Sequence, residues 1–129
     1  MTPPQVDVQK VITFFYYRDL PAAIAFYEDR LGLERAIDQG WCKIYEIGGA
    51  AHVGLVDEAR GMNRASATKP VQLCIRVADV DAWYDYARKA ALPDLSELWR
   101  NDDLGIRAFV FRDPEGYQIE IQQATRAGA

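Results

Sequence analysis

Few residues of this chain have side chains that suit metal or nucleophilic chemistry. The 129 residues include one histidine, His52, and two cysteines, Cys42 and Cys74. A structural zinc site needs four such ligands at close spacing, so this count excludes a zinc finger or a histidine-rich metal site within one chain. Cys74 would need a nearby base to act as a nucleophile, and we interpret it as a small packed side chain that lines a ligand site.

Glu120 and Arg76 are the charged candidates for that site. A carboxylate such as Glu120 can act as a general base, or it can form a structural salt bridge with Arg76 or Arg107. Arg76 can bind an anionic ligand through paired hydrogen bonds, or it can be a solvated residue at the rim. His52 has three interpretations: a hydrogen-bonded or exposed strand histidine beside a turn, a metal ligand, or a proton-transfer group.

Aromatic side chains are the second signal. Rings that line a groove bind flat or apolar ligands by stacking and burial, although a single aromatic side chain more often belongs to the core. Six aromatic residues lie in segments that could line a groove: Phe14, Tyr16, Trp41, Tyr45, Trp99 and Phe109. Trp99 has polar neighbours, and we expect it in a loop over the mouth of the groove.

Composition narrows the classes of partner. The formal net charge is −4 and the pI is about 4.9, so a phosphate backbone would be repelled and we expect no nucleic-acid partner. No apolar run approaches the roughly 20 residues that span a bilayer, and the first residues lack the features of a signal peptide. The two cysteines do not have the spacing of a disulfide framework, which favours a protein of the reducing cytoplasm. The alternative is an extracellular protein with a Cys42–Cys74 disulfide.

The pattern of residues predicts the elements that position these side chains. Residues 1–9, with two prolines, form an irregular lead-in. A β-branched and aromatic run predicts a strand over 11–17, and a helix extends from an Asp19 cap to Gly32. Strands around 41–47 and 52–56 flank a Gly-Gly turn, with room for a short strand at 34–37. Residues 57–70 are polar and predict a loop.

The second half of the chain repeats this order. Strands are predicted over 71–77, 106–112 and 117–123, a helix begins after Asp79 and stops at Pro93, and a short strand fits near 98–100. Asp19 and Asp79 lie 60 positions apart. The predicted fold class is therefore α+β, with two tandem βαβββ modules, 10–57 and 70–123, in a single domain over residues 1–129.

Alternation along each strand assigns its side chains to two faces of the sheet. One face packs against the helix of its module, and the other lines a cup. A shift of register by one residue would invert each set. The residues expected on the cup face are Ile12, Phe14, Tyr16, His52, Gly54, Val56, Gln72, Cys74, Arg76, Gln118, Glu120 and Gln122.

Three segments resemble the vicinal oxygen chelate superfamily, which includes glyoxalase I, bleomycin-resistance proteins, fosfomycin-resistance enzymes and extradiol dioxygenases. They are YRDLPAAIAFYEDRLGL at 17–33, VADVDAW at 77–83 and FRDPEGYQIEI at 111–121. The resemblance covers nearly the whole chain. It implies the glyoxalase/bleomycin resistance-like fold, in which two modules form a cup-shaped mixed sheet around a pocket, and it implies a homodimer.

The resemblance also identifies where a metal would be held. Metal-using relatives carry four ligands, one from the first and one from the last strand of each module, and these positions are Ile12, Gly54, Gln72 and Glu120. The side chains of Ile12 and Gly54 have no ligating atom. We therefore expect no cofactor. A divalent metal held by His52, Gln72 and Glu120, with a local bulge bringing the histidine within reach, is the alternative.

Two functions fit these observations. The first, which we favour, is a binder of a small aromatic or apolar molecule, held without a metal as in antibiotic-sequestering relatives. The second is an enzyme of the same fold, a lyase, epimerase or dioxygenase that uses Glu120 as metal ligand or catalytic base; a regulatory or assembly domain is a third reading. The residues expected to bind the ligand are Phe14, Tyr16, Trp41, His52, Gln72, Cys74, Arg76, Trp99, Phe109 and Gln118.

Overall fold

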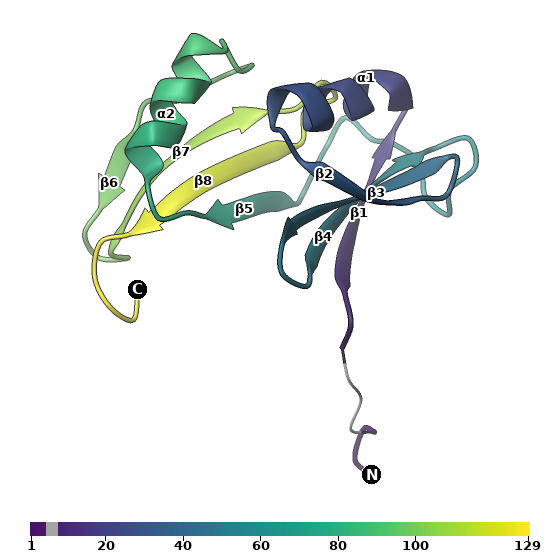
Figure 1. The fold of residues 1–129 in the computed structure, drawn as a ribbon, viewed down its shortest axis with the longest axis horizontal. Coiled ribbons are helices and arrows are strands. Elements are labelled where there is room, and N and C mark those ends of the chain that lie inside the picture. Colours follow the sequence, from purple (N-terminus) through teal and green to yellow (C-terminus); the bar gives the residue numbers. More distant parts are fainter. Residues whose placement is uncertain (5–7) are drawn as a thin grey trace. The chain divides into compact units, whose positions relative to one another are not determined.

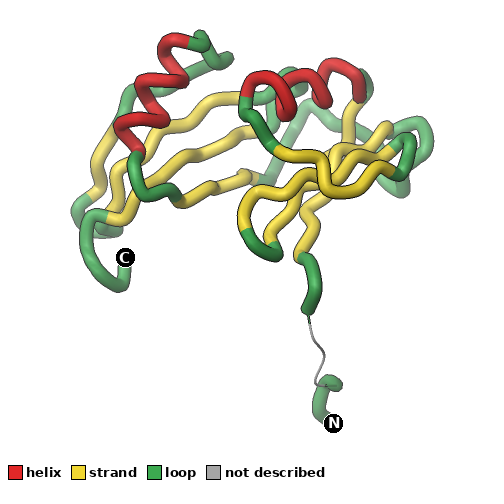
Figure 2. The backbone as a smooth tube through the Cα atoms, in the orientation of Figure 1, coloured by secondary structure: helices red, strands yellow, loops and turns green. Residues whose placement is uncertain are grey.

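The computed structural model describes residues 1–4 and 8–129, so residues 5–7 of the expected lead-in lie outside the described residues. The chain divides into two compact units, Met1–Ala65 (unit 1) and Ser66–Ala129 (unit 2). Each unit contains a helical segment and a four-stranded sheet, drawn in red and yellow in Figure 2. The fold is α+β, and the βαβββ order predicted from the repeat is present in both units.

Unit 1 has its strands in the order β1-β4-β3-β2. The β1–β4 pair is parallel, and the β4–β3 and β3–β2 pairs are antiparallel. Its elements are β1 (Val11–Tyr17), α1 (Leu20–Ala25), the π-helical turn η1 (Phe26–Arg30), β2 (Glu34–Asp38), β3 (Cys42–Gly48) and β4 (Ala51–Asp57). The first strand has the bounds that the sequence predicted, and the predicted loop follows β4.

The helical segment of unit 1 begins at the predicted cap. The Asp19 carboxylate accepts a hydrogen bond from the backbone N–H of Ala22 at 3.1 Å, and Gly32 follows the helix with a φ of 68°. The second half widens into a π-helical turn, in which the N–H of Leu31 donates to the carbonyl of Phe26 at 3.1 Å. The apolar stripe predicted an uninterrupted helix because it does not distinguish an α turn from a π turn.

The core of unit 1 lies between the sheet and the helical segment. Alternate residues of β1 and β4 point into it, as the period of two predicted. Burial of this apolar face holds the helical segment on the sheet. The buried side chains of this core are Phe15, Tyr17, Leu20, Ala23, Phe26, Tyr27, Tyr45, Val53 and Leu55.

Unit 2 repeats the arrangement with the strand order β5-β8-β7-β6, in which only β5 and β8 are parallel. Figure 1 shows α2 against one face of this sheet, and Asp79 caps this helix by accepting from the N–H of Ala82 at 3.0 Å. The elements are β5 (Gln72–Arg76), α2 (Val80–Lys89), β6 (Trp99–Asn101), β7 (Ile106–Arg112) and β8 (Gln118–Ala124). In the described ranges, no helix is long and apolar enough to cross a membrane.

Phe109 belongs to the core of unit 2, which corrects its expected place in a ligand groove. Its side chain is fully buried, and its ring centroid lies 5.1 Å from that of Tyr84 on α2. The reason is register. Phe109 pairs with Ile121 across the β7–β8 ladder, and directly opposed residues share one face. Since Ile121 faces the helix, Phe109 does too.

Candidate functional site

The face of the unit 1 sheet opposite the helical segment carries an apolar cluster. Cys42, Ile44 and Val56 are buried in this cluster, and Tyr16 packs against them, together with Ile12 and Ile37. Alternation predicted that β1 and β4 would present side chains on this face, and it placed Tyr16 and Val56 correctly. The surface is apolar because β3 adds Cys42 and Ile44, two residues that the sequence did not single out for the site.

A hollow of about 120 Å³ opens on this face. Phe14 and Trp41 remain 43% and 39% exposed, so their rings are accessible beside buried apolar side chains. The structure brings together three of the aromatic residues expected at a ligand site. The residues that line the hollow are Phe14, Tyr16, Gln39, Trp41, Cys42, Val56, Gly61 and Met62.

Gly61 brings the loop that follows β4 into contact with the wall of the hollow. A Cβ atom placed on Gly61 would lie 2.5 Å from Cγ1 of Val56 and 3.0 Å from Cε1 of Tyr16. Real Cβ atoms essentially never approach another heavy atom as closely as the first of these distances. The backbone of this loop can therefore lie against the sheet only because residue 61 has no side chain.

Arg64 holds the same loop in shape. Its Nη1 atom lies 2.7 Å from the carbonyl oxygen of Glu58, 2.9 Å from that of Gly61 and 3.1 Å from that of Asn63. The Glu58 carboxylate in turn accepts from the N–H of Ala65 at 3.0 Å. Sequence reasoning predicted the loop but missed its part in the site, because loops closed by side-chain-to-backbone bonds have no apolar period.

Gly54 lies in β4 directly beside Phe14 of β1. A Cβ atom on Gly54 would be 2.5 Å from Cδ1 and 2.7 Å from Cε1 of the Phe14 ring. The ring therefore occupies the space that a side chain at position 54 would need. The absence of a side chain at position 54 is what lets the aromatic ring lie against the strand.

His52 is buried, with 4% of its surface exposed. Its Nδ1 atom lies 2.8 Å from the carbonyl oxygen of Ala50, next to the β3–β4 turn. This contact agrees with the interpretation of His52 as a hydrogen-bonded strand histidine. In the part of the chain that the structure describes, no group of three histidine, cysteine, aspartate or glutamate side chains lies close enough together to hold a metal ion.

The face of the unit 2 sheet opposite α2 carries a polar strip, made of Gln72, Cys74, Arg76, Glu120 and Gln122. Oε1 of Glu120 accepts from the Gln72 amide at 2.5 Å, and Oε2 accepts from the Gln122 amide at 2.6 Å. Arg76 donates from Nε and Nη2 to Oε1 of Gln122, at 2.8 and 2.5 Å. Because arginine has only donors, it fixes the Gln122 oxygen towards itself and the Gln122 amide towards Glu120.

Glu120 is therefore held by amides, and the alternative of a salt bridge with Arg76 or Arg107 is wrong. Arg107 lies on the helix face, where it donates to both carboxylate oxygens of Asp81 at 2.7 and 2.8 Å. Arg76 uses its remaining nitrogen to bond the main-chain oxygen of Ala129 at 2.5 Å. Its guanidinium is thus engaged within unit 2 by both Gln122 and the last residue of the sequence.

Cys74 lies within the polar strip, and its Sγ atom is 3.7 Å from Oε2 of Glu120. Desolvation of the sulfur raises the pKa of the Cys74 thiol, and the adjacent Glu120 charge raises it further. A raised pKa opposes formation of the thiolate, which is the nucleophilic form. The environment of Cys74 is therefore that of an unactivated thiol.

Trp99 and Gln118 extend the same face of unit 2. Trp99 is the first residue of β6, which confirms the short strand expected near 98–100 and corrects the interpretation of Trp99 as a loop residue. It pairs with Ala108 of β7, and Ala108 pairs with Gln122 of β8. Because opposed residues share a face, Trp99 stands beside the polar strip, where 36% of its surface is exposed. Gln118 precedes Glu120 by two residues and so points to the same side.

The residues at the four metal-ligand positions of the resemblance do not fit a divalent ion. Ile12 and Gly54 supply no ligating atom, and the Phe14 ring covers Gly54. Glu120 already accepts a hydrogen bond at each oxygen, and the nitrogen of the Gln72 amide, which cannot ligate, points towards it. A hard divalent ion needs several free oxygen or imidazole ligands in one place.

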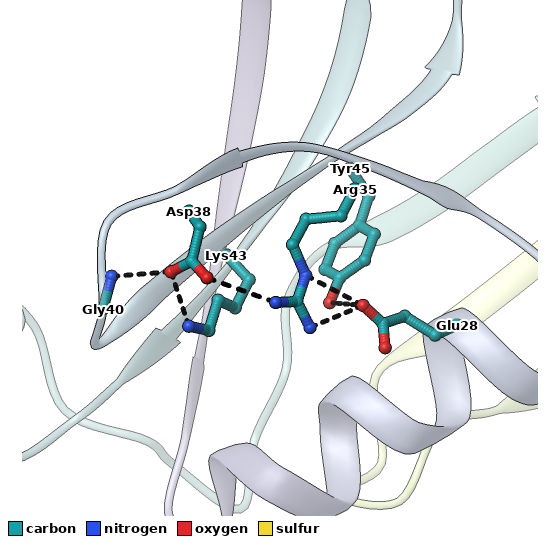
Figure 3. Close-up of polar contacts among 6 residues, drawn as sticks. All are labelled: Glu28, Arg35, Asp38, Gly40, Lys43 and Tyr45. Atoms are coloured by element: carbon teal, nitrogen blue, oxygen red, sulfur yellow. Dashed lines mark hydrogen bonds and ion pairs between the residues drawn. The ribbon is translucent and has the colours of Figure 1, made fainter.

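A charged cluster on the helix side of the unit 1 sheet was missed by sequence reasoning (Figure 3). Oε1 of Glu28 accepts from Tyr45 Oη at 3.0 Å and lies 2.6 Å from Nη2 of Arg35. Asp38 pairs with Arg35 at 3.2 Å and with Lys43 at 2.5 Å. The cluster thus connects η1 to β2 and β3. Its members are scattered between positions 28 and 45 and follow no motif.

Tyr45 is the buried member of this cluster, and its place on the helix side corrects the expectation that it could line a ligand groove. Its side chain is fully buried, and burial, followed by the hydrogen bond to Glu28, raises the pKa of its hydroxyl to about 12. The hydrogen bond from Lys43 lowers the pKa of the Asp38 carboxyl. Each charge in the cluster has an opposite partner, so the arrangement is typical of a structural clamp that holds edge strand β2 on the helical segment.

Comparison with known families identifies the class of protein. The model of the Glyoxalase/Bleomycin resistance protein/Dioxygenase superfamily matches residues 10–121. The chain therefore belongs to this superfamily, as its three sequence segments indicated. Comparison with curated proteins finds no match.

Solved structures of the same fold include proteins of different function. Lactoylglutathione lyase from Agrobacterium tumefaciens is 25% identical, with a TM-score of 0.73 over 99% of this chain and 100% of that one. The antibiotic-binding protein TnmS3 from Streptomyces sp. CB03234 is 22% identical, with a TM-score of 0.74 over 95% and 99%. A glyoxalase/bleomycin resistance protein/dioxygenase from Nocardioides is 19% identical, with a TM-score of 0.76 over 98% and 89%. Function must therefore be argued from the site.

Proposed function

We propose that this protein binds a small organic molecule, through an aromatic or apolar part, in the hollow of unit 1 and without a metal ion. The observation that carries the proposal is the pair of exposed rings, Phe14 and Trp41, beside the buried side chains of Cys42 and Val56. Concave apolar surfaces with accessible aromatic rings are typical of small-molecule sites.

The expected affinity follows from the area that a ligand ring can bury. A ring that removes about 150 Å² of apolar surface from water gains roughly 4 kcal/mol at about 25 cal/mol per Å². That free energy corresponds to a dissociation constant of about 1 mM. Tighter binding would need further polar contacts, for which Gln39 lies at the edge of the hollow.

The wider setting of the function is also part of the proposal. TnmS3 is an antibiotic-binding protein, which supports antibiotics with aromatic parts as one ligand class for this chain. Both cysteines are free, which supports a reducing compartment such as the cytoplasm. We further propose a homodimer, as the family resemblance implies. Light scattering at micromolar concentration should give twice the mass of one chain, and the mass of a single chain would contradict the dimer.

The binding proposal can be tested with p-cresol as a one-ring probe. The chain has three tryptophans, whose indole N–H signals separate in a two-dimensional NMR spectrum. Titration should shift the signal of Trp41, with a dissociation constant of about 1 mM, and leave that of Trp83 on α2 in place. Phe14→Ala should weaken the effect, whereas Tyr86→Ala, which removes a ring of similar exposure outside the hollow, should not. An unmoved Trp41 signal would refute the proposal.

The metal-free part of the proposal has its own measurement. Elemental analysis of protein purified without chelator should find less than a stoichiometric amount of any divalent ion. We expect this because Ile12 and Gly54 have no ligating side-chain atom. One zinc, nickel, iron or manganese ion per chain would contradict the metal-free proposal.

The second candidate function is an enzyme in which Glu120 acts as a base. The observation that favours it is the orientation of this carboxylate by the amides of Gln72 and Gln122. Glu120→Gln keeps the shape of the side chain and removes its basicity. If the wild type converts a bound substrate, this variant should lose turnover while retaining binding, and unchanged turnover would exclude Glu120 as the base.

A further inference from the structure

The dimensions of the hollow restrict the shape of the group that it can hold. Its volume is about 120 Å³. An apolar cavity of roughly 150 Å³ in a protein interior holds one benzene molecule. The hollow of unit 1 is thus comparable in size to one six-membered ring, so the rest of a larger ligand would lie outside it.

Three aromatic side chains surround this space. Phe14, Tyr16 and Trp41 line the hollow from β1 and from the residue that precedes β3. Aromatic rings prefer offset-stacked or edge-to-face contacts with centroids about 4.5–7 Å apart. A flat ring can make such contacts with these side chains, whereas a globular aliphatic group has no ring face to offer them.

Gly61 lies where the loop after β4 meets the wall of the hollow. Its backbone lies against Val56 and Tyr16 so closely that a Cβ atom would come within 2.5 and 3.0 Å of them. Val56 is buried in a strand and cannot turn away, so any side chain at position 61 must displace either Tyr16 or the loop. Both movements change the width of the space between the loop and the sheet.

From these observations we infer that the hollow accepts a single aromatic ring at the end of a larger ligand, and that Gly61 is the residue that determines this size. The inference rests on the proposed binding function of the same hollow. Beyond binding itself, the bound group then has a defined shape, and a glycine of the loop after β4 selects for that shape.

The test compares two probes of similar polarity and different thickness, p-cresol and 1-adamantanol, with the Trp41 indole signal as the readout. The wild type should bind p-cresol at least about tenfold more tightly than 1-adamantanol, since overpacking a tight apolar site costs that much or more. Equal affinities would overturn the inference while leaving the binding function intact. If neither probe moves the Trp41 signal, the binding function itself fails.

A pair of glycine variants tests the assigned residue. Gly61→Ala should weaken p-cresol binding about tenfold or more. Gly48→Ala is the matched control, because a Cβ atom there meets nothing within 4 Å, and it should bind p-cresol as the wild type does. Thermal unfolding of both variants checks that they fold. A folded Gly61→Ala variant that binds p-cresol with wild-type affinity would overturn the role of Gly61. The size limit itself is tested separately, by comparing p-cresol with 1-adamantanol on the wild-type protein.

Discussion

Replacing Tyr45 by phenylalanine should remove part of the pH dependence of unfolding between pH 10 and pH 12, the ordinary and the folded-state pKa of this hydroxyl. Below pH 10 the hydroxyl is neutral in both states, so its contribution to stability is fully present. As the pH rises, the unfolded chain loses this proton first. The contribution is therefore lost progressively until the pH passes about 12, where the folded protein ionises as well.

The magnitude follows from the size of the shift. The pKa rises from 10.0 to about 12, and each unit corresponds to about 1.4 kcal/mol. The wild-type free energy of unfolding should therefore fall more steeply than that of Tyr45→Phe, by up to about 1.4 kcal/mol per pH unit. At neutral pH the variant should lose only the hydrogen bond to Glu28, about 1 kcal/mol, because Glu28 keeps its pairing with Arg35.

The assay is urea unfolding of both proteins at several values between pH 8 and pH 11.5, a range that brackets the ordinary pKa of 10.0. Other tyrosines and lysines titrate in both proteins, so the difference between the two curves isolates Tyr45. Glu28→Gln separates the two causes of the raised Tyr45 pKa, burial and the Glu28 carboxylate. The variant retains the burial of Tyr45 and offers a neutral acceptor oxygen. Most of the extra slope should persist in it, because burial is the larger cause. Parallel curves for wild type and Tyr45→Phe would refute the reasoning.

Three further predictions concern packing, capping and thiol reactivity. Gly54→Ala should lower the free energy of unfolding by about 1–3 kcal/mol, since a Cβ atom would meet the Phe14 ring; a change below 0.5 kcal/mol in urea unfolding would mean that the ring moves freely. Asp79→Ala should cost about 1 kcal/mol by removing the cap of α2, and Asp79→Asn should restore most of it. With a thiol reagent, exposed Cys74 should react before unfolding and buried Cys42 only after it; two thiols that react at one rate would contradict this order.

Much of the fold could be predicted because the strand period of two and the helical period of 3.6 residues both coincide with burial. The bounds of β1 follow from a run of β-branched and aromatic residues, and both helix starts follow from Asp19 and Asp79, which cap them as expected. The period of two also placed Glu120 and Gln72 on one face, where the structure joins them by a hydrogen bond. A repeated order of elements then gave the architecture of both units.

The unpredicted features depend on contacts between residues that no local pattern links. Glu120 bonds amides instead of Arg107 because Arg107 lies on the other face, beside Asp81 of the helix. The burial of Phe109 follows from its register with β8, which the sequence of β7 alone does not define. The place of Gly61 against the sheet depends on a loop that closes through its own side-chain-to-backbone bonds.

Phe14 and Gly54 form a coupled pair, because the ring occupies the space that a side chain at position 54 would need. A histidine at position 54 would first have to displace the Phe14 ring, at a cost of about 1–3 kcal/mol. Removing the ring first would uncover a strand glycine and leave a gap in the sheet surface. Either single step is expected to cost stability before a ligating side chain gains any partner. The design of a metal ligand at position 54 should therefore replace Phe14 in the same step, so that the new side chain enters space already vacated by the ring.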